Sequence, residues 1–183
     1  MEMMYFSEEE KKEIIKYGFE RGKNSFIFIF VTIMIGCFFK VFCQSILFIL
    51  IFCSLRRYAG GYHADSQKRC YVISFIAIVI TFGGMRFLTY NREVCFFIQA
   101  ICLLAILIFS PVENKNHKLE ENERIKYGRK TKITAIVLFA FSCFLYKDKN
   151  SYIIFPLVSA YLLVTISLLL GFAKNKYENK KSL

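Results

Sequence analysis

His63 and Cys70, seven positions apart, are the two residues of this chain whose types and spacing best suit chemistry. Cys70 directly follows Lys68 and Arg69, whereas the other six cysteines lie within or at the edge of apolar runs, where a free thiol acts as a small hydrophobic side chain. Neighbouring cations and the start of a helix near Tyr71 favour the thiolate. Imidazole is the usual base for a thiol, so the pair indicates nucleophilic catalysis.

The distance between these residues along the chain limits how they can meet. Seven helical residues put both side chains on one face but separate their Cα atoms by about 10.5 Å, too far for a direct S–N hydrogen bond. Gly60 and Gly61 offer a place to interrupt a helix, because glycine permits positive φ and close backbone approach. We therefore expect a broken or re-entrant segment around these glycines, which membrane depth tolerates where backbone lines a polar cavity.

Other interpretations of the same residues stay open. The segment can also be interpreted as a polar loop with a surface histidine and a boundary cysteine. His117 could replace His63 as the base, although it lies in a strongly charged stretch. His63, Asp65, Cys70 and His117 show no usual zinc spacing, so we expect neither a metal nor another cofactor.

The composition indicates a membrane protein. The 183 residues are 56% hydrophobic, include 21 Phe and 11 Tyr, and have a mean hydropathy of +0.42, which is more large apolar surface than a soluble interior of this size can bury. The net charge of +11 falls in short clusters between apolar runs, which is typical of loops flanking membrane spans rather than of nucleic-acid binding. We predict one membrane-embedded domain over residues 1–183, with no nucleic-acid partner and no cleavable signal peptide.

The distribution of Lys and Arg discriminates between five and six spans. The apolar block 25–55 would make one helix of about 46 Å, against a hydrocarbon core of about 30 Å, and Lys40 interrupts it, so we expect a hairpin there. Six spans place 20 of the 25 Lys and Arg on one side, whereas five spans divide them 15 to 9 and leave Lys40 in lipid. The prediction is an all-α protein of the cell membrane, with both termini and residues 56–70 cytoplasmic. The six transmembrane helices are expected near residues 25–39, 41–55, 71–85, 95–109, 133–146 and 152–173.

An amphipathic helix is expected before the first span. Ser7 and Glu10 have capping-box spacing, and Ile14, Ile15 and Phe19 form an apolar stripe between charged residues. This pattern predicts an interfacial helix over residues 7–22 on the cytoplasmic surface, with an ordinary solvated helix as the alternative.

Arg56, the Gly-Gly-Tyr-His run that ends at His63, and Cys70 together resemble the accessory gene regulator B (AgrB) family of low-GC Gram-positive bacteria. The stretches IIKYGFE at 14–20 and SPVENKNHKLE at 110–120 add to the likeness. The resemblance implies an integral-membrane cysteine endopeptidase for an AgrD-type quorum-sensing propeptide. It makes Cys70 the nucleophile and His63 the general base, and puts Arg56 and Gly61 at positions needed for activity.

The implied reaction suggests roles for further residues. An acyl-enzyme thioester on Cys70 would allow ring closure to a thiolactone or lactone, with Gly60, Gly61 or Arg56 donating to the oxyanion. The resemblance also fits a homodimer and a propeptide with an acidic tail. Basic residues that could attract this tail, or serve only to set topology, are Lys68, Arg69, Lys126, Arg129 and Lys130. The alternative class is a small exporter, channel or scaffold, which the scarcity of ionisable residues within the spans disfavours.

Overall fold

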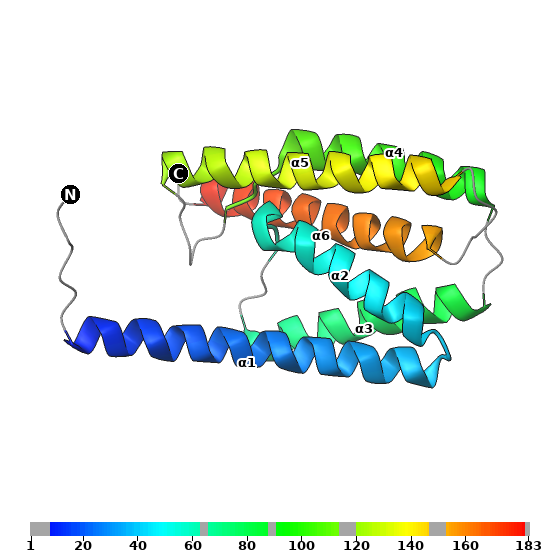
Figure 1. Ribbon diagram of the computed structural model, residues 1–183. Helices are drawn as coiled ribbons and strands as arrows, with labels where there is room; N and C mark the ends of the chain where they lie inside the picture. The colour runs from blue at the N-terminus through cyan, green and yellow to red at the C-terminus, as the bar shows by residue number, and fades with distance from the viewer. Residues whose placement is uncertain (1–7, 63–65, 88–90, 114–119, 147–152, 182–183) are drawn as a thin grey trace.

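The computed structural model describes residues 8–62, 66–87, 91–113, 120–146 and 153–181. Its helices alternate in direction along the chain: α1, α3 and α5 begin on the side of the bundle where α2, α4 and α6 finish (Figure 1). This order confirms the all-α class. The helices are α1 (Glu8–Phe38), α2 (Phe42–Ala59), α3 (Gln67–Phe87), α4 (Arg92–Phe109), α5 (Glu121–Tyr146) and α6 (Ile154–Lys181).

Several helices are long and apolar enough to cross a membrane. Within the described residues there are four, whereas α1 contributes a shorter apolar part, Gly22–Phe38. Helix α5 is not among them, since its first half is strongly charged. These helices are compatible with a multi-pass membrane protein, and the number of six spans stays a prediction. The four stretches are Phe42–Ala59, Lys68–Phe87, Arg92–Phe109 and Ile154–Glu178.

Helix α1 differs from the prediction. A single helix of 31 residues covers Glu8–Phe38, where two elements were expected over 7–22 and 25–39. Helical hydrogen bonding continues through Gly22, Asn24 and Ser25, although residues of these types often cap helices, and no proline interrupts it. The predicted interfacial helix and the first predicted span therefore form one continuous helix in Figure 1, not two separately oriented helices.

The predicted hairpin at Lys40 is confirmed. Helix α1 ends at Phe38 and α2 begins at Phe42, with Lys40 in the left-handed region at φ 59°. The turn closes through a hydrogen bond of 2.8 Å from the Val41 N–H to the carbonyl of Gly36. Antiparallel packing of α1 and α2 follows from this tight turn.

Helix α6 is the centre of the bundle. It packs along both α4 and α2, and 61% of its apolar stretch is buried, against 17% for α3 at the periphery. Polar side chains tie its neighbours together: Tyr161 donates to the carbonyl of Ala135 over 2.5 Å, and Ser142 donates to Oε1 of Gln99 over 2.6 Å. Residues placed near α6 are thus held by the best-packed part of the molecule.

Candidate functional site

The connection between α2 and α3 is broken where the glycine pair predicts. Helix α2 ends at Ala59, and Gly60 and Gly61 follow with φ of 71° and 119°. L-residues with side chains rarely adopt these angles, so the two glycines are needed for the backbone itself. We call residues 60–62 the glycine linker; the predicted break is confirmed, whereas its re-entrance into the membrane is not tested.

One side of the glycine linker pairs with the chain that leaves α4. The Val112 N–H donates to the carbonyl of Ala59 over 3.0 Å, and the Gly61 N–H donates to the carbonyl of Val112 over 3.2 Å. This is a single parallel bridge between Gly60 and Val112. A Cβ atom on Gly60 would collide with the Val112 carbonyl, so the close approach also requires glycine.

The other side of the glycine linker rests on α6. The Tyr62 N–H donates to the carbonyl of Ser167 over 2.8 Å. A Cβ atom on Gly171 would lie 2.7 Å from both the Gly61 carbonyl carbon and the Tyr62 nitrogen. Sequence reasoning missed Ser167 and Gly171, because a serine and a glycine in an apolar helix have no pattern that assigns them a partner.

Arg56 braces the glycine linker from the last turn of α2. Its Nη2 donates to the Tyr62 carbonyl over 2.9 Å. Its Nη1 packs against Gly61, where an added Cβ atom would lie 2.5 Å from Nη1. Nη1 is buried and has no hydrogen-bond partner within the described part of the chain. The structure therefore places two of the predicted residues, Arg56 and Gly61, in direct proximity, with one guanidinium donor unused.

Cys70 is in the first turn of α3, which begins at Gln67, four residues before the predicted helix start near Tyr71. Ser66 stands before this helix, where its hydroxyl accepts from the Arg69 N–H over 3.3 Å and its carbonyl accepts from the Cys70 N–H over 3.1 Å. The Cys70 thiol is free and half-buried. It lies close enough to Arg56 for a thiolate and the guanidinium to interact electrostatically.

Three of the predicted or alternative site residues, His63, Asp65 and His117, lie outside the described residues. His63 directly follows Tyr62, whose backbone N–H and carbonyl are both engaged. The pairing of His63 with Cys70 thus stays a prediction. Within the described ranges no three His, Cys, Asp or Glu side chains come together in a way that could hold a metal ion.

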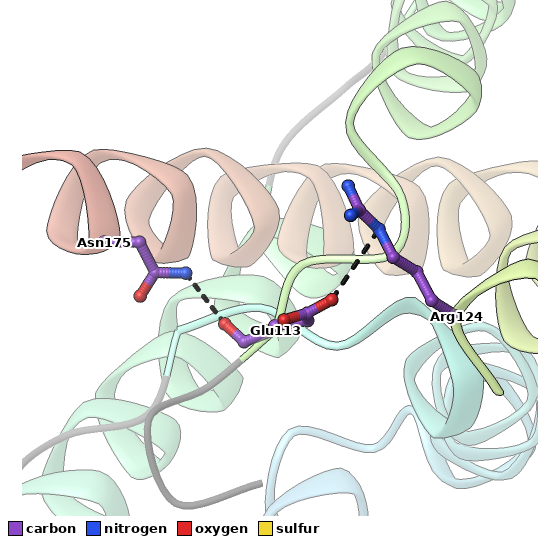
Figure 2. A network of polar contacts seen from close by, with 3 residues as sticks. All are labelled: Glu113, Arg124 and Asn175. Atoms are coloured by element: carbon purple, nitrogen blue, oxygen red, sulfur yellow. Dashed lines mark hydrogen bonds and ion pairs between the residues drawn. The ribbon is translucent and has the colours of Figure 1, made fainter. Parts of the chain in front are cut away.

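The chain after α4 is itself fastened, which matters because it carries Val112. Figure 2 shows Glu113 between two neighbours: its backbone carbonyl accepts from Nδ2 of Asn175 over 2.8 Å, and its carboxylate is 3.6 Å from Nε of Arg124. Asn175 belongs to α6 and Arg124 to α5. Helices α2, α5 and α6 therefore all contribute to the support of the glycine linker.

The structure brings only some of the predicted basic residues together. The Nζ of Lys130 on α5 lies 4.9 Å from the ring of Tyr58 at the end of α2, and Lys126 and Arg129 are exposed nearby on α5. Lys68 and Arg69 are exposed on α3, which packs against α1 and α6. Sequence reasoning overlooked Lys174 of α6, whose Nζ lies 5.4 Å from the ring of Tyr62 in the glycine linker.

Comparison with known proteins identifies relatives of this chain. The sequence profile of the family described as accessory gene regulator B matches residues 3–170. A putative AgrB-like protein of Clostridium perfringens is 27% identical over 139 residues, which are 72% of this chain and 65% of the relative. The accessory gene regulator protein B of Staphylococcus carnosus is 28% identical over 122 residues, 67% of this chain and 62% of the relative.

A further relative is more extensively covered. The accessory gene regulator protein B of Staphylococcus aureus is 24% identical over 152 residues, 83% of this chain and 76% of the relative. The chain spans about 65% of the length of the Clostridium perfringens relative. No solved structure matches the chain significantly.

Proposed function

The chain belongs to the accessory gene regulator B family, which implies a role in the accessory gene regulator quorum-sensing system, and on that premise we propose that it is a membrane cysteine endopeptidase. Its substrate in this proposal is an AgrD-type propeptide, which it cleaves and helps to cyclise. The observation that carries the proposal is the glycine linker. The linker is held by α2, by α6 and by the chain after α4, and it ends at the residue before His63. It also lies beside Arg56, whose guanidinium is within electrostatic range of Cys70.

The reaction begins with a proton transfer from the Cys70 thiol to His63. The thiolate attacks the carbonyl carbon of the scissile bond, and the C–N bond of the resulting tetrahedral intermediate breaks. His63 returns the proton to the departing amine, so the C-terminal fragment leaves and a thioester on Cys70 remains. A cysteine or serine within the propeptide then attacks the thioester, closing a thiolactone or lactone and releasing Cys70.

Arg56 has the geometry for a supporting role in this reaction. Its Nη2 donates to the Tyr62 carbonyl, whereas the buried Nη1 has no hydrogen-bond acceptor among the described residues. In the proposal Nη1 donates to the oxyanion of the tetrahedral intermediate. A donor held in advance by backbone contacts costs little reorganisation when charge develops.

The test uses purified protein in lipid nanodiscs with the cognate propeptide. Cys70→Ala and His63→Ala should abolish cleavage, while Cys143→Ala, which alters an exposed free cysteine on α5, should leave it intact. Wild type should accumulate a propeptide-sized adduct on Cys70 that hydroxylamine removes. Cleavage by Cys70→Ala at the wild-type rate would refute the proposal.

The exporter, channel or scaffold alternative predicts that these variants keep their function. Within the described residues the polar residues that are buried are neutral, including Thr32, Gln99, Ser142 and Thr165. The partly buried guanidinium of Arg56 lies at the end of α2 beside the glycine linker. Ionisable side chains in the interior are the usual mark of an ion or proton pathway. The buried polar residues along the described helices are neutral, and Arg56 contacts the glycine linker at one end of the bundle, so this distribution favours the peptidase over transport.

The proposed orientation has its own test. Both termini, the glycine linker and Cys70 lie on the cytoplasmic side in this proposal, because that end of the bundle carries most of the Lys and Arg. A membrane-impermeant thiol reagent should leave Cys70 unlabelled in intact cells and label it in inverted vesicles. Labelling of Cys70 from outside intact cells would contradict the orientation.

A further inference from the structure

An open groove of about 650 Å³ runs between the end of α4 and the first two-thirds of α5, and we call it the α4–α5 groove. Pro111 forms part of its wall, and Gly128 lets α5 approach: a Cβ on Gly128 would lie 3.1 Å from Cδ of Pro111. The groove therefore results from packing of the chain after α4 against α5. None of the residues proposed for catalysis lines it.

One part of the α4–α5 groove is basic. Arg124, Arg129 and Lys132 line it, together with a single acid, Glu121. Arg124 is held toward Glu113 (Figure 2), while Arg129 and Lys132 have no ion-pair partner among the described residues. Two cations therefore remain available to a negatively charged ligand. A phosphodiester suits them because it offers several acceptor oxygens at one point.

The rest of the groove is aliphatic and exposed. Ile133 and Ile136 follow the basic residues along α5 and are 55% and 50% exposed, and Ile108 of α4 is 72% exposed. Ile108 is in the last turn of Arg92–Phe109, a helix apolar and long enough to cross a membrane. A ligand that fills the whole groove must therefore be anionic at one end and apolar at the other.

We propose that the α4–α5 groove binds an anionic phospholipid. Its phosphodiester lies at Arg129 and Lys132, and an acyl chain runs along Ile108, Ile133 and Ile136. Basic pockets between membrane helices bind such headgroups, and the neighbouring isoleucines match the chain that follows. An acidic peptide would satisfy the cations but leave the aliphatic wall uncovered. The assignment does not require the proposed peptidase activity, although Arg129 is also one of the basic residues expected to attract the propeptide tail.

The test measures lipid retention by native mass spectrometry. Full-length protein in detergent is titrated with phosphatidylglycerol and, separately, with phosphatidylcholine of the same acyl chains. Wild type should prefer phosphatidylglycerol. The pair Arg129→Gln with Lys132→Gln should weaken binding by about 30-fold, given about 1 kcal/mol for each cation near an anionic lipid and 1.4 kcal/mol per tenfold.

The matched control is Lys126→Gln with Lys130→Gln, which removes two charges from the same helix outside the groove. This pair should retain phosphatidylglycerol as wild type does. Equal losses from both pairs would show diffuse attraction and overturn the proposal.

Ile133→Ser should weaken the binding of long-chain phosphatidylglycerol but not of its dihexanoyl form. Complete displacement of the lipid by inorganic phosphate or by an acidic peptide at equal concentration would also overturn the proposal, because neither competitor occupies the aliphatic wall.

Discussion

Gly171→Ala tests whether contact with α6 sets the position of the glycine linker. The new Cβ would lie 2.7 Å from the Gly61 carbonyl carbon and the Tyr62 nitrogen, while ordinary contact begins at 3.4 Å. The linker or α6 must therefore move by about 0.7 Å. Overpacking of this kind costs about 1–3 kcal/mol, and the better helix propensity of alanine returns at most about 1 kcal/mol.

The expected effect is larger on activity than on stability. A misplacement of about 1 Å in a catalytic arrangement can cost about 100-fold in rate. We expect kcat for propeptide cleavage to fall by about 10- to 100-fold, because Tyr62 carries His63 with it. The assay is steady-state cleavage in nanodiscs, with kcat expressed per reactive Cys70 thiol and with helix content followed by circular dichroism.

Gly83→Ala is the matched control. The same change in α3 would put a Cβ 3.8 and 3.9 Å from two ring atoms of Phe39, which is ordinary contact. This variant should cleave the propeptide like wild type. If Gly171→Ala were equally active at the same folded amount, the glycine linker would not depend on close contact with α6, and the positional argument would fail.

Arg56→Lys should lower kcat by about 100- to 1,000-fold with a smaller change in KM, because one ammonium cannot replace both Nη2, which is bound to the Tyr62 carbonyl, and the unused Nη1. Steady-state kinetics would measure this loss. Full activity in the lysine variant would exclude a role for Nη1 as the second donor. Tyr161→Phe should lower the free energy of unfolding by about 1 kcal/mol, since it removes the hydrogen bond to the Ala135 carbonyl. Denaturant titration in detergent measures this loss, and an unchanged midpoint would mean that the bond contributes nothing net.

The general architecture follows from local features of the sequence. Apolar blocks separated by charged clusters predict helices and their order, and the structure has a helix over each expected span. Lys40 marks the hairpin because a charge in the middle of an apolar block favours a turn there. The boundary expected near residues 22–25 is absent, since a weak amphipathic stripe does not require a helix to stop.

Only part of the candidate site could be predicted from such local features of the sequence. Cys70 at a helix start and a break at Gly60 and Gly61 were predicted, because capping and glycine conformations are local properties. The contacts of Val112 and Ser167 with the linker were not predicted. They depend on which helices pack together, and no local pattern encodes that.

The sequence by itself determined where the linker must bend and which residues next to it carry reactive groups, because glycine adopts the required positive φ without steric cost. Only the tertiary structure decided what holds the bent linker in place. Val112 comes from the chain after α4 and Gly171 from α6, at least 50 and more than 100 residues along the chain from the glycine linker. Close packing brings them to the linker, and that packing is a property of the whole bundle.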